Sequence, residues 1–155
     1  MQIERTLLAA QGYIELDMAE EALRELNSLP IEEQGRREVM QVRLFIFMRG
    51  RRWRDAMGIC DKLRAADPQQ TTGYIHGAFC LHEMGKTREA KDLLLSGPAA
   101  LLREATYYYN MGCYDAVLGN LADAQHALEI SFKMDDKFRE IAKYDPDLKE
   151  VVAML

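Results

Sequence analysis

The stretch that decides the fold of this chain runs from Gly73 to Leu95 and reads GYIHGAFCLHEMGKTREAKDLLL. Apolar residues recur at helical spacing on both sides of Gly85, which predicts a helix, a turn and a second helix. Small residues on both helices, Gly77, Ala78 and Ala90, allow the two helices to pack closely. The same pattern recurs along the chain, so this helical hairpin is the repeating element of the fold.

Alanines mark the repeat, because Ala22, Ala56, Ala90 and Ala124 are evenly spaced with a period of about 34 residues. Four residues after each alanine stands an apolar residue: Leu26, Cys60, Leu94 and Leu128. Nine residues before each alanine stand Tyr13, Phe47, Leu81 and Asp115, of which three are large and apolar. A fixed period of this length predicts a stacked array of helix pairs, because one pair cannot bury its apolar faces alone.

At these offsets the sequence resembles the tetratricopeptide repeat (TPR) family, whose units span about 34 residues. The resemblance covers about residues 3–136. It implies an all-α fold, a right-handed superhelix (α-α solenoid) of about four TPR-like helix pairs with a C-terminal capping helix. It also implies a single TPR-like domain over 1–155. The units are expected at about 3–30, 37–68, 71–98 and 99–133, and the cap at 135–155.

Apolar periodicity and turn residues set the expected helices. Besides the hairpin at 73–95, we expect helices over 3–15, 18–26, 32–49, 53–66, 99–117 and 120–133, the fifth beginning at Pro98 or Ala99. Gly85 and Gly119 hold one turn position, and Gly50 lies one residue off that register. A short helix over 138–144 follows, and Asp145-Pro146-Asp147 predicts a last helix start, with an aspartate N-cap and proline in the first turn.

Composition excludes several classes of function. The net charge of −5 argues against nucleic acid as the main partner. No apolar run approaches the roughly 18 residues of a transmembrane helix, so we expect no membrane partner. The first residues lack the basic and apolar regions of a signal peptide. Three cysteines without disulfide-like or metal-like spacing suit a reducing compartment, so we expect a cytoplasmic protein.

Residues that carry chemistry form no recognisable catalytic set. His76 and His82 are six residues apart, about 120° around a helix, so they do not converge with Cys113 on a metal. No glycine-rich phosphate loop or acid–base pair stands out. We therefore expect no enzyme activity, no metal and no cofactor. Asp115 and Arg43 stand where the family has apolar residues, and the sequence leaves open whether each is paired or exposed by a local shift.

The resemblance places the binding surface on the first helix of each pair, which lines the concave face in this family. Apolar and aromatic side chains dominate this face, which predicts a non-catalytic protein–protein interaction or scaffold module whose partner docks as an amphipathic helix or extended peptide. Alternatively, Phe45 and Phe79 pack between units or lie under the C-terminal helix. Self-association into a homo-oligomer stays open. By register the groove residues are Gln11, Gln41, Phe45, Met48, Arg49, Ile75, His76, Phe79, His82, Tyr109, Asn110 and Cys113.

A basic cluster at 49–54 gives a second hypothesis. Arginines at 49, 51, 52 and 54 surround Trp53, and arginine beside an aromatic residue is a common way to hold RNA. The cluster therefore predicts, as an alternative, RNA or an acidic partner at this turn. Against it stands the simpler interpretation of a solvated turn in which Trp53 packs between helices.

Overall fold

The computed structural model describes residues 2–155, and none of these residues lies in a strand. Four helix pairs follow one another: α1 (Gln2–Glu15) with α2 (Ala19–Asn27), α4 (Arg37–Arg49) with α5 (Trp53–Ala66), α6 (Thr72–Glu83) with α7 (Thr87–Leu95), and α8 (Ala105–Val117) with α9 (Leu121–Met134). Short elements join or follow them: α3 (Ile31–Gln34), the 3-10 helices η1 (Ala99–Arg103) and η2 (Pro146–Leu148), α10 (Lys137–Lys143) and α11 (Lys149–Val152). Among the helices of residues 2–155, none has the length and apolar character needed to cross a membrane.

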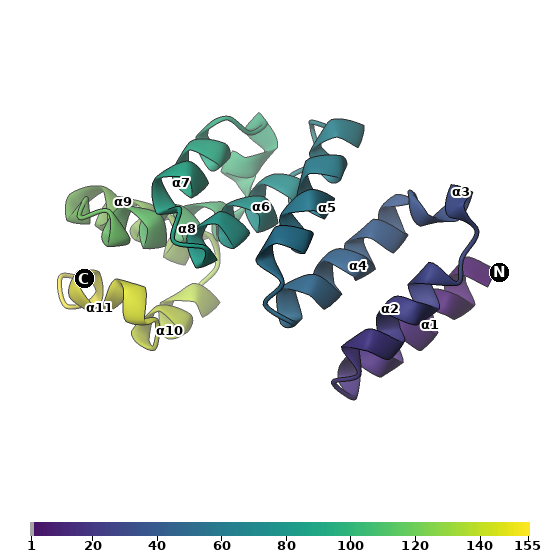
Figure 1. Cartoon of the computed structure of the whole chain (residues 1–155). Helices are drawn as coiled ribbons and strands as arrows, with labels where there is room; N and C mark the ends of the chain where they lie inside the picture. Colours follow the sequence, from purple (N-terminus) through teal and green to yellow (C-terminus); the bar gives the residue numbers. More distant parts are fainter. Residues whose placement is uncertain (1) are drawn as a thin grey trace.

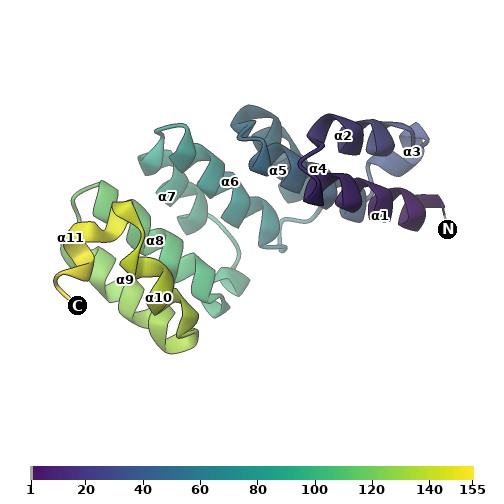
Figure 2. The same cartoon turned by 90° about the horizontal axis from the view of Figure 1, so that it is seen from below.

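The helix pairs stack side by side into an arch (Figure 1). The pair α1 and α2 forms one lower end of the arch, and the C-terminal segment α10–α11 lies at the other. Seen from below, α10 and α11 lie over α8 and α9 (Figure 2), and η2 packs on α8. The predicted all-α solenoid of helix pairs with a C-terminal cap is confirmed.

The alanine ladder marks the closest contacts inside the pairs. All four alanines are fully buried, and so are the four residues that follow them by one turn. Inside the last pair, a Cβ added to Gly112 of α8 would lie 2.7 Å from Leu128 Cγ of α9. The alanines therefore lie in the closely packed interior of each pair, where a larger side chain would have to displace its neighbours.

One turn position recurs in all four pairs with a left-handed backbone. Its φ values are 58°, 59°, 80° and 85° at Asp17, Arg51, Gly85 and Gly119, which follow the same period as the alanines. In each pair the next amide donates to a carbonyl five residues before it, with an N–O distance of 2.8 Å. This bond ends the first helix in the manner of a Schellman motif. Gly50, offered above as a turn glycine, is outside the left-handed region at φ −82°, and Arg51 holds the position instead.

The prediction of a single helix over 32–49 is wrong, because the helix is interrupted between Gln34 and Arg37. Arg36 has extended backbone, with φ −66° and ψ 144°. The amide side chain of Gln34 donates to the carbonyls of Asn27 and Leu29, at 3.3 and 3.0 Å, which ties α3 to the end of α2.

The helix expected over 99–117 is also interrupted. Residues 99–103 form η1, Glu104 is extended at φ −111° and ψ 123°, and α8 begins only at Ala105. Leu101 of η1 is 1% exposed and belongs to the largest core cluster. Burial of this leucine favours a separate tight turn over one continuous helix. The N-cap predicted at Asp145 is confirmed, since its carboxylate accepts from the Asp147 amide at 3.0 Å.

The two residues that depart from the family pattern are both paired. Asp115 is 5% exposed and accepts from Lys91 Nζ at 2.6 Å and from Asn120 Nδ2 at 3.2 Å. Arg43 is partly buried and donates from Nη1 to Asn27 Oδ1 at 2.9 Å. Burial lowers the pKa of the Arg43 guanidinium. Both side chains join neighbouring helix pairs, because Lys91 lies on α7 and Asn27 on α2.

Candidate protein-binding groove

The first helices of the first two pairs, α1 and α4, enclose a hollow of about 550 Å³, called here the N-terminal groove. Phe45 lines this groove and is 56% exposed, so more than half of its surface is open to solvent. The groove is lined by Leu7, Gln11, Ile14, Glu15, Glu38, Gln41, Val42, Phe45 and Arg49. The groove thus lies between the first helices of two successive pairs.

Apolar side chains form the floor of the N-terminal groove and polar ones its edge. Ile14 is buried, and Leu7 and Val42 are half-buried against the hydrophobic core that α1, α2 and α4 form together. Glu15 and Glu38 are exposed at the edge. Arg49 is also exposed, but its Nη2 is 3.0 Å from Asp17 Oδ1, an ion pair that joins α4 to the α1–α2 turn. The groove therefore offers an apolar surface beside carboxylates, and its one basic lining residue, Arg49, is already paired with Asp17.

The first helices of the last two pairs, α6 and α8, enclose a second hollow of about 600 Å³, the C-terminal groove. Here the chain's own tail forms one wall, because Asp145, Pro146 and Asp147 line the hollow. Tyr109 and Cys113 of α8 are 7% and 6% exposed. The tail thus covers part of the face of α8 that lines this groove.

Two tail carboxylates hold this wall in place. Asp145 Oδ2 accepts from the Tyr109 hydroxyl at 2.7 Å and from Cys113 Sγ at 3.6 Å. Asp147 Oδ2 is 2.9 Å from His82 Nε2, and the other ring nitrogen of His82 is 2.9 Å from Thr87 Oγ1. Burial is the main cause that raises the pKa of Tyr109 and of Cys113, with the Asp145 carboxylate contributing to both. Both groups therefore remain protonated donors at neutral pH.

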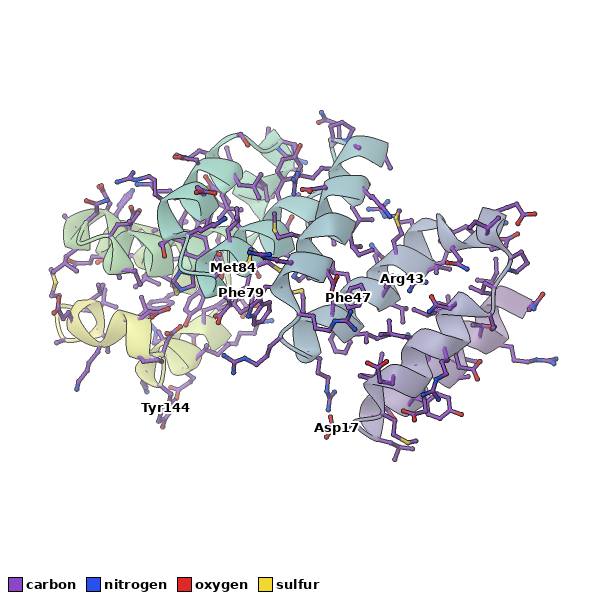
Figure 3. All side chains as sticks on the ribbon, viewed as in Figure 1. Asp17, Arg43, Phe47, Phe79, Met84 and Tyr144 are labelled. Carbon is purple, nitrogen blue, oxygen red and sulfur yellow. The ribbon has the colours of Figure 1, made fainter. Side chains whose placement is uncertain are left out.

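The structure divides the predicted groove residues between three environments. Gln11, Gln41, Phe45 and Arg49 line the N-terminal groove. Phe79, His82, Tyr109, Asn110 and Cys113 line the C-terminal groove beside the tail. Ile75 is buried in the core, and Met48 and His76 are half-buried, with burial lowering the pKa of His76. Figure 3 places Phe79 near the middle of the arch, with Asp17 and Tyr144 at its two ends.

Sequence reasoning did not select several groove residues. Glu15 and Glu38 are one turn from predicted residues, and the helical period could have found them. Asp145 and Asp147 were assigned only to a helix start. Nothing in their spacing indicates that they face His82 and Tyr109, because that contact depends on how the tail folds back.

Part of the basic cluster at 49–54 is engaged within the fold, whereas Arg51 and Arg54 are exposed. Arg52 Nε donates to Asp55 at 2.8 Å, and its guanidinium lies 4.7 Å from the centre of the Phe47 ring. Trp53 makes an edge-to-face contact with Phe79, with ring centres 5.8 Å apart. The indole therefore packs between α5 and α6, which agrees with the solvated-turn interpretation. In the part of the chain that the structure describes, no three His, Cys, Asp or Glu side chains gather closely enough to hold a metal ion.

Four stacked helix pairs, a left-handed backbone position in every turn and a capped C-terminal end define a TPR-like α-solenoid fold. A solved structure named MamA RS-1 ArsTM double mutant is similar, with a TM-score of 0.74 and 18% identity over 93% of this chain and 86% of that one. At this identity the likeness supports the fold alone. No family model matches the chain. No curated protein matches it either.

Proposed function

We propose that this protein is a non-catalytic scaffold module that docks an α-helix or an extended peptide of another protein in the N-terminal groove. The observation that carries the proposal is Phe45, a large aromatic side chain that stands 56% exposed in a hollow of about 550 Å³. Exposed apolar surface rimmed by polar groups commonly marks an interaction site. Phe45 is thus the anchor of the proposed interface.

The energetics of interfaces support Phe45 as the anchor. Aromatic side chains buried at an interface often contribute about 2 kcal/mol or more each. Leu7 and Val42 border the ring, so a partner side chain placed there would be surrounded by apolar atoms. An amphipathic helix or an extended peptide can supply such side chains at regular spacing. A TPR-type fold is compatible with this role, and we place the protein in the cytoplasm, because its three cysteines are buried free thiols.

The test is binding of a neutral amphipathic probe, a peptide of about 18 residues with leucine on one face and glutamine on the other. Phe45→Ala should weaken its affinity at least about tenfold, which corresponds to about 1.4 kcal/mol. Leu95→Ala is the matched control, because Leu95 is 60% exposed on α7, away from the groove. Both variants should unfold at the same urea concentration as the parent. Equal affinities of parent and Phe45→Ala would contradict the proposal.

A further inference from the structure

The two grooves are the same site of the repeat, two periods apart. Seven residues of the N-terminal groove have a counterpart two periods later in the lining of the C-terminal groove. The pairs are Gln11 with Phe79, Ile14 with His82, Glu15 with Glu83, Gln41 with Tyr109, Val42 with Asn110, Phe45 with Cys113, and Arg49 with Val117. The tail segment that forms one wall of the C-terminal groove therefore shows what these repeat positions bind in that half, and the side chains at the same positions can be compared in the N-terminal groove.

The tail segment in the C-terminal groove is acidic, and its two carboxylates are held by three polar side chains. Asp145 is held by Tyr109 and Cys113, and Asp147 is held by His82. The counterparts of these donors in the N-terminal groove are Gln41, Phe45 and Ile14. Two of the three are hydrocarbon side chains that cannot donate a hydrogen bond. A carboxylate docked in the same manner would lose its water there without gaining these partners, at a cost in free energy.

The charges at the edge of the N-terminal groove also disfavour an acidic occupant. Glu15 and Glu38 are both exposed, and Arg36, whose Nη1 is 3.9 Å from Glu38 Oε1, also pairs with Glu33. Arg49, the one basic lining residue, already pairs with Asp17. The carboxylates thus leave a negative edge beside an apolar floor. Positive potential on a partner would be complementary to it.

We propose that the N-terminal groove takes a basic amphipathic segment of another protein. Its apolar residues would lie on Leu7, Val42 and Phe45, and its Lys or Arg side chains beside Glu15 and Glu38. This inference rests on the proposed function and adds the charge of the partner. It disfavours the tail of a second copy as occupant, because the stretch Asp145-Pro146-Asp147 would bring carboxylates to Glu15 and to an apolar floor.

The experiment compares three fluorescent peptides that share the leucine face and differ in the polar face, which is lysine, glutamine or glutamate. Affinities are measured by anisotropy at about 0.15 M salt, where only nearby charges interact strongly. The lysine peptide should bind most tightly and the glutamate peptide least. Reversal of both edge charges in Glu15→Lys/Glu38→Lys should lower the affinity for the lysine peptide by about tenfold and raise the affinity for the glutamate peptide.

The control is Glu129→Lys/Glu150→Lys, which changes the net charge equally at exposed sites on α9 and α11. This variant should leave the order of the three peptides unchanged. Equal effects of the two double variants, or a glutamate peptide that binds the parent as tightly as the lysine peptide, would overturn the inference. A synthetic peptide of residues 135–155 that binds the parent tightly but not Phe45→Ala would also overturn the inference. In that case the tail of a second copy would be the occupant.

These outcomes separate the inference from the proposed function. If the glutamine peptide binds and Phe45→Ala weakens it, while charge has no effect, the groove binds a partner and only the stated charge is wrong. If the glutamine peptide binds no better to the parent than to Phe45→Ala, the proposed function itself fails.

Discussion

Phe45 is 56% exposed, whereas Cys113, which holds the same position two repeats later, is 6% exposed. The helices around the two residues share one register, so the backbone of the repeat does not explain this difference. The difference comes from the tail, which packs on α8 through buried Leu148 and through contacts of its carboxylates with Tyr109, His82 and Cys113. Polar contacts to the tail carboxylates, together with the buried tail residues Leu148 and Val151, thus distinguish the covered repeat surface from the exposed one.

The largest expected effect is on the anchoring of the tail. Leu148→Ala should lower the free energy of unfolding by about 2–5 kcal/mol, because Leu148 is fully buried against the last helix pair and its loss leaves a cavity. Urea denaturation measures the change. Leu155→Ala is the control, since Leu155 is 47% exposed and should cost little. Equal costs for the two leucines would show that the tail does not cover the C-terminal groove as described.

A smaller effect is expected from the hydrogen bond between α8 and the tail. Tyr109→Phe removes the hydroxyl that donates to Asp145 and should lower stability by about 1–2 kcal/mol. Tyr108→Phe is the matched control, because the Tyr108 hydroxyl makes an exposed bond of 3.2 Å to the Leu102 carbonyl. Thermal unfolding of the two variants compares the bonds directly. A Tyr109→Phe variant as stable as Tyr108→Phe would mean that Asp145 does not depend on this donor.

The smallest expected effect concerns the turns, where the two halves also differ. The N-terminal turns place Asp17 and Arg51 in the left-handed region, and the C-terminal turns place Gly85 and Gly119 there. Because a side chain is strained in this conformation, Arg51→Gly should stabilise the fold by about 1 kcal/mol. Gly85→Ala should destabilise it by a similar amount. Opposite signs in a urea series would support the turn assignment, and two losses of stability would contradict it.

Much of the fold could be predicted from the sequence, because the close contacts repeat. Ala22, Ala56 and Ala90 are all fully buried at the same position of the repeat, so the period is visible without coordinates. The left-handed turn position also follows the period, although it is hard to recognise in the second pair, where arginine takes the place of the glycine found in the last two pairs. The break before Arg37 could not be predicted, because Glu32 to Gln34 favour a helix and the break depends on bonds from Gln34 to the end of α2.

The candidate site was less predictable than the fold. Register identifies first-helix residues such as Phe45 and Tyr109 equally well, but it contains no information on what covers them. Coverage of Tyr109 depends on the tail folding back so that Phe138 stacks on its ring at 5.0 Å and Asp145 accepts its hydroxyl. The apolar stripe of Leu148 and Val151 predicts that the tail is buried and does not predict the surface that buries it.

The central claim is that the N-terminal groove receives a partner while the tail stays on the C-terminal groove. It is tested most directly by NMR of the isotope-labelled protein titrated with the leucine–glutamine peptide. Amide shifts should concentrate on α1 and α4 around Gln11, Gln41 and Phe45, with the signals of Tyr109 and Asp145 unchanged. Shifts centred on α6, α8 and residues 145–148, with α1 and α4 unaffected, would contradict the account.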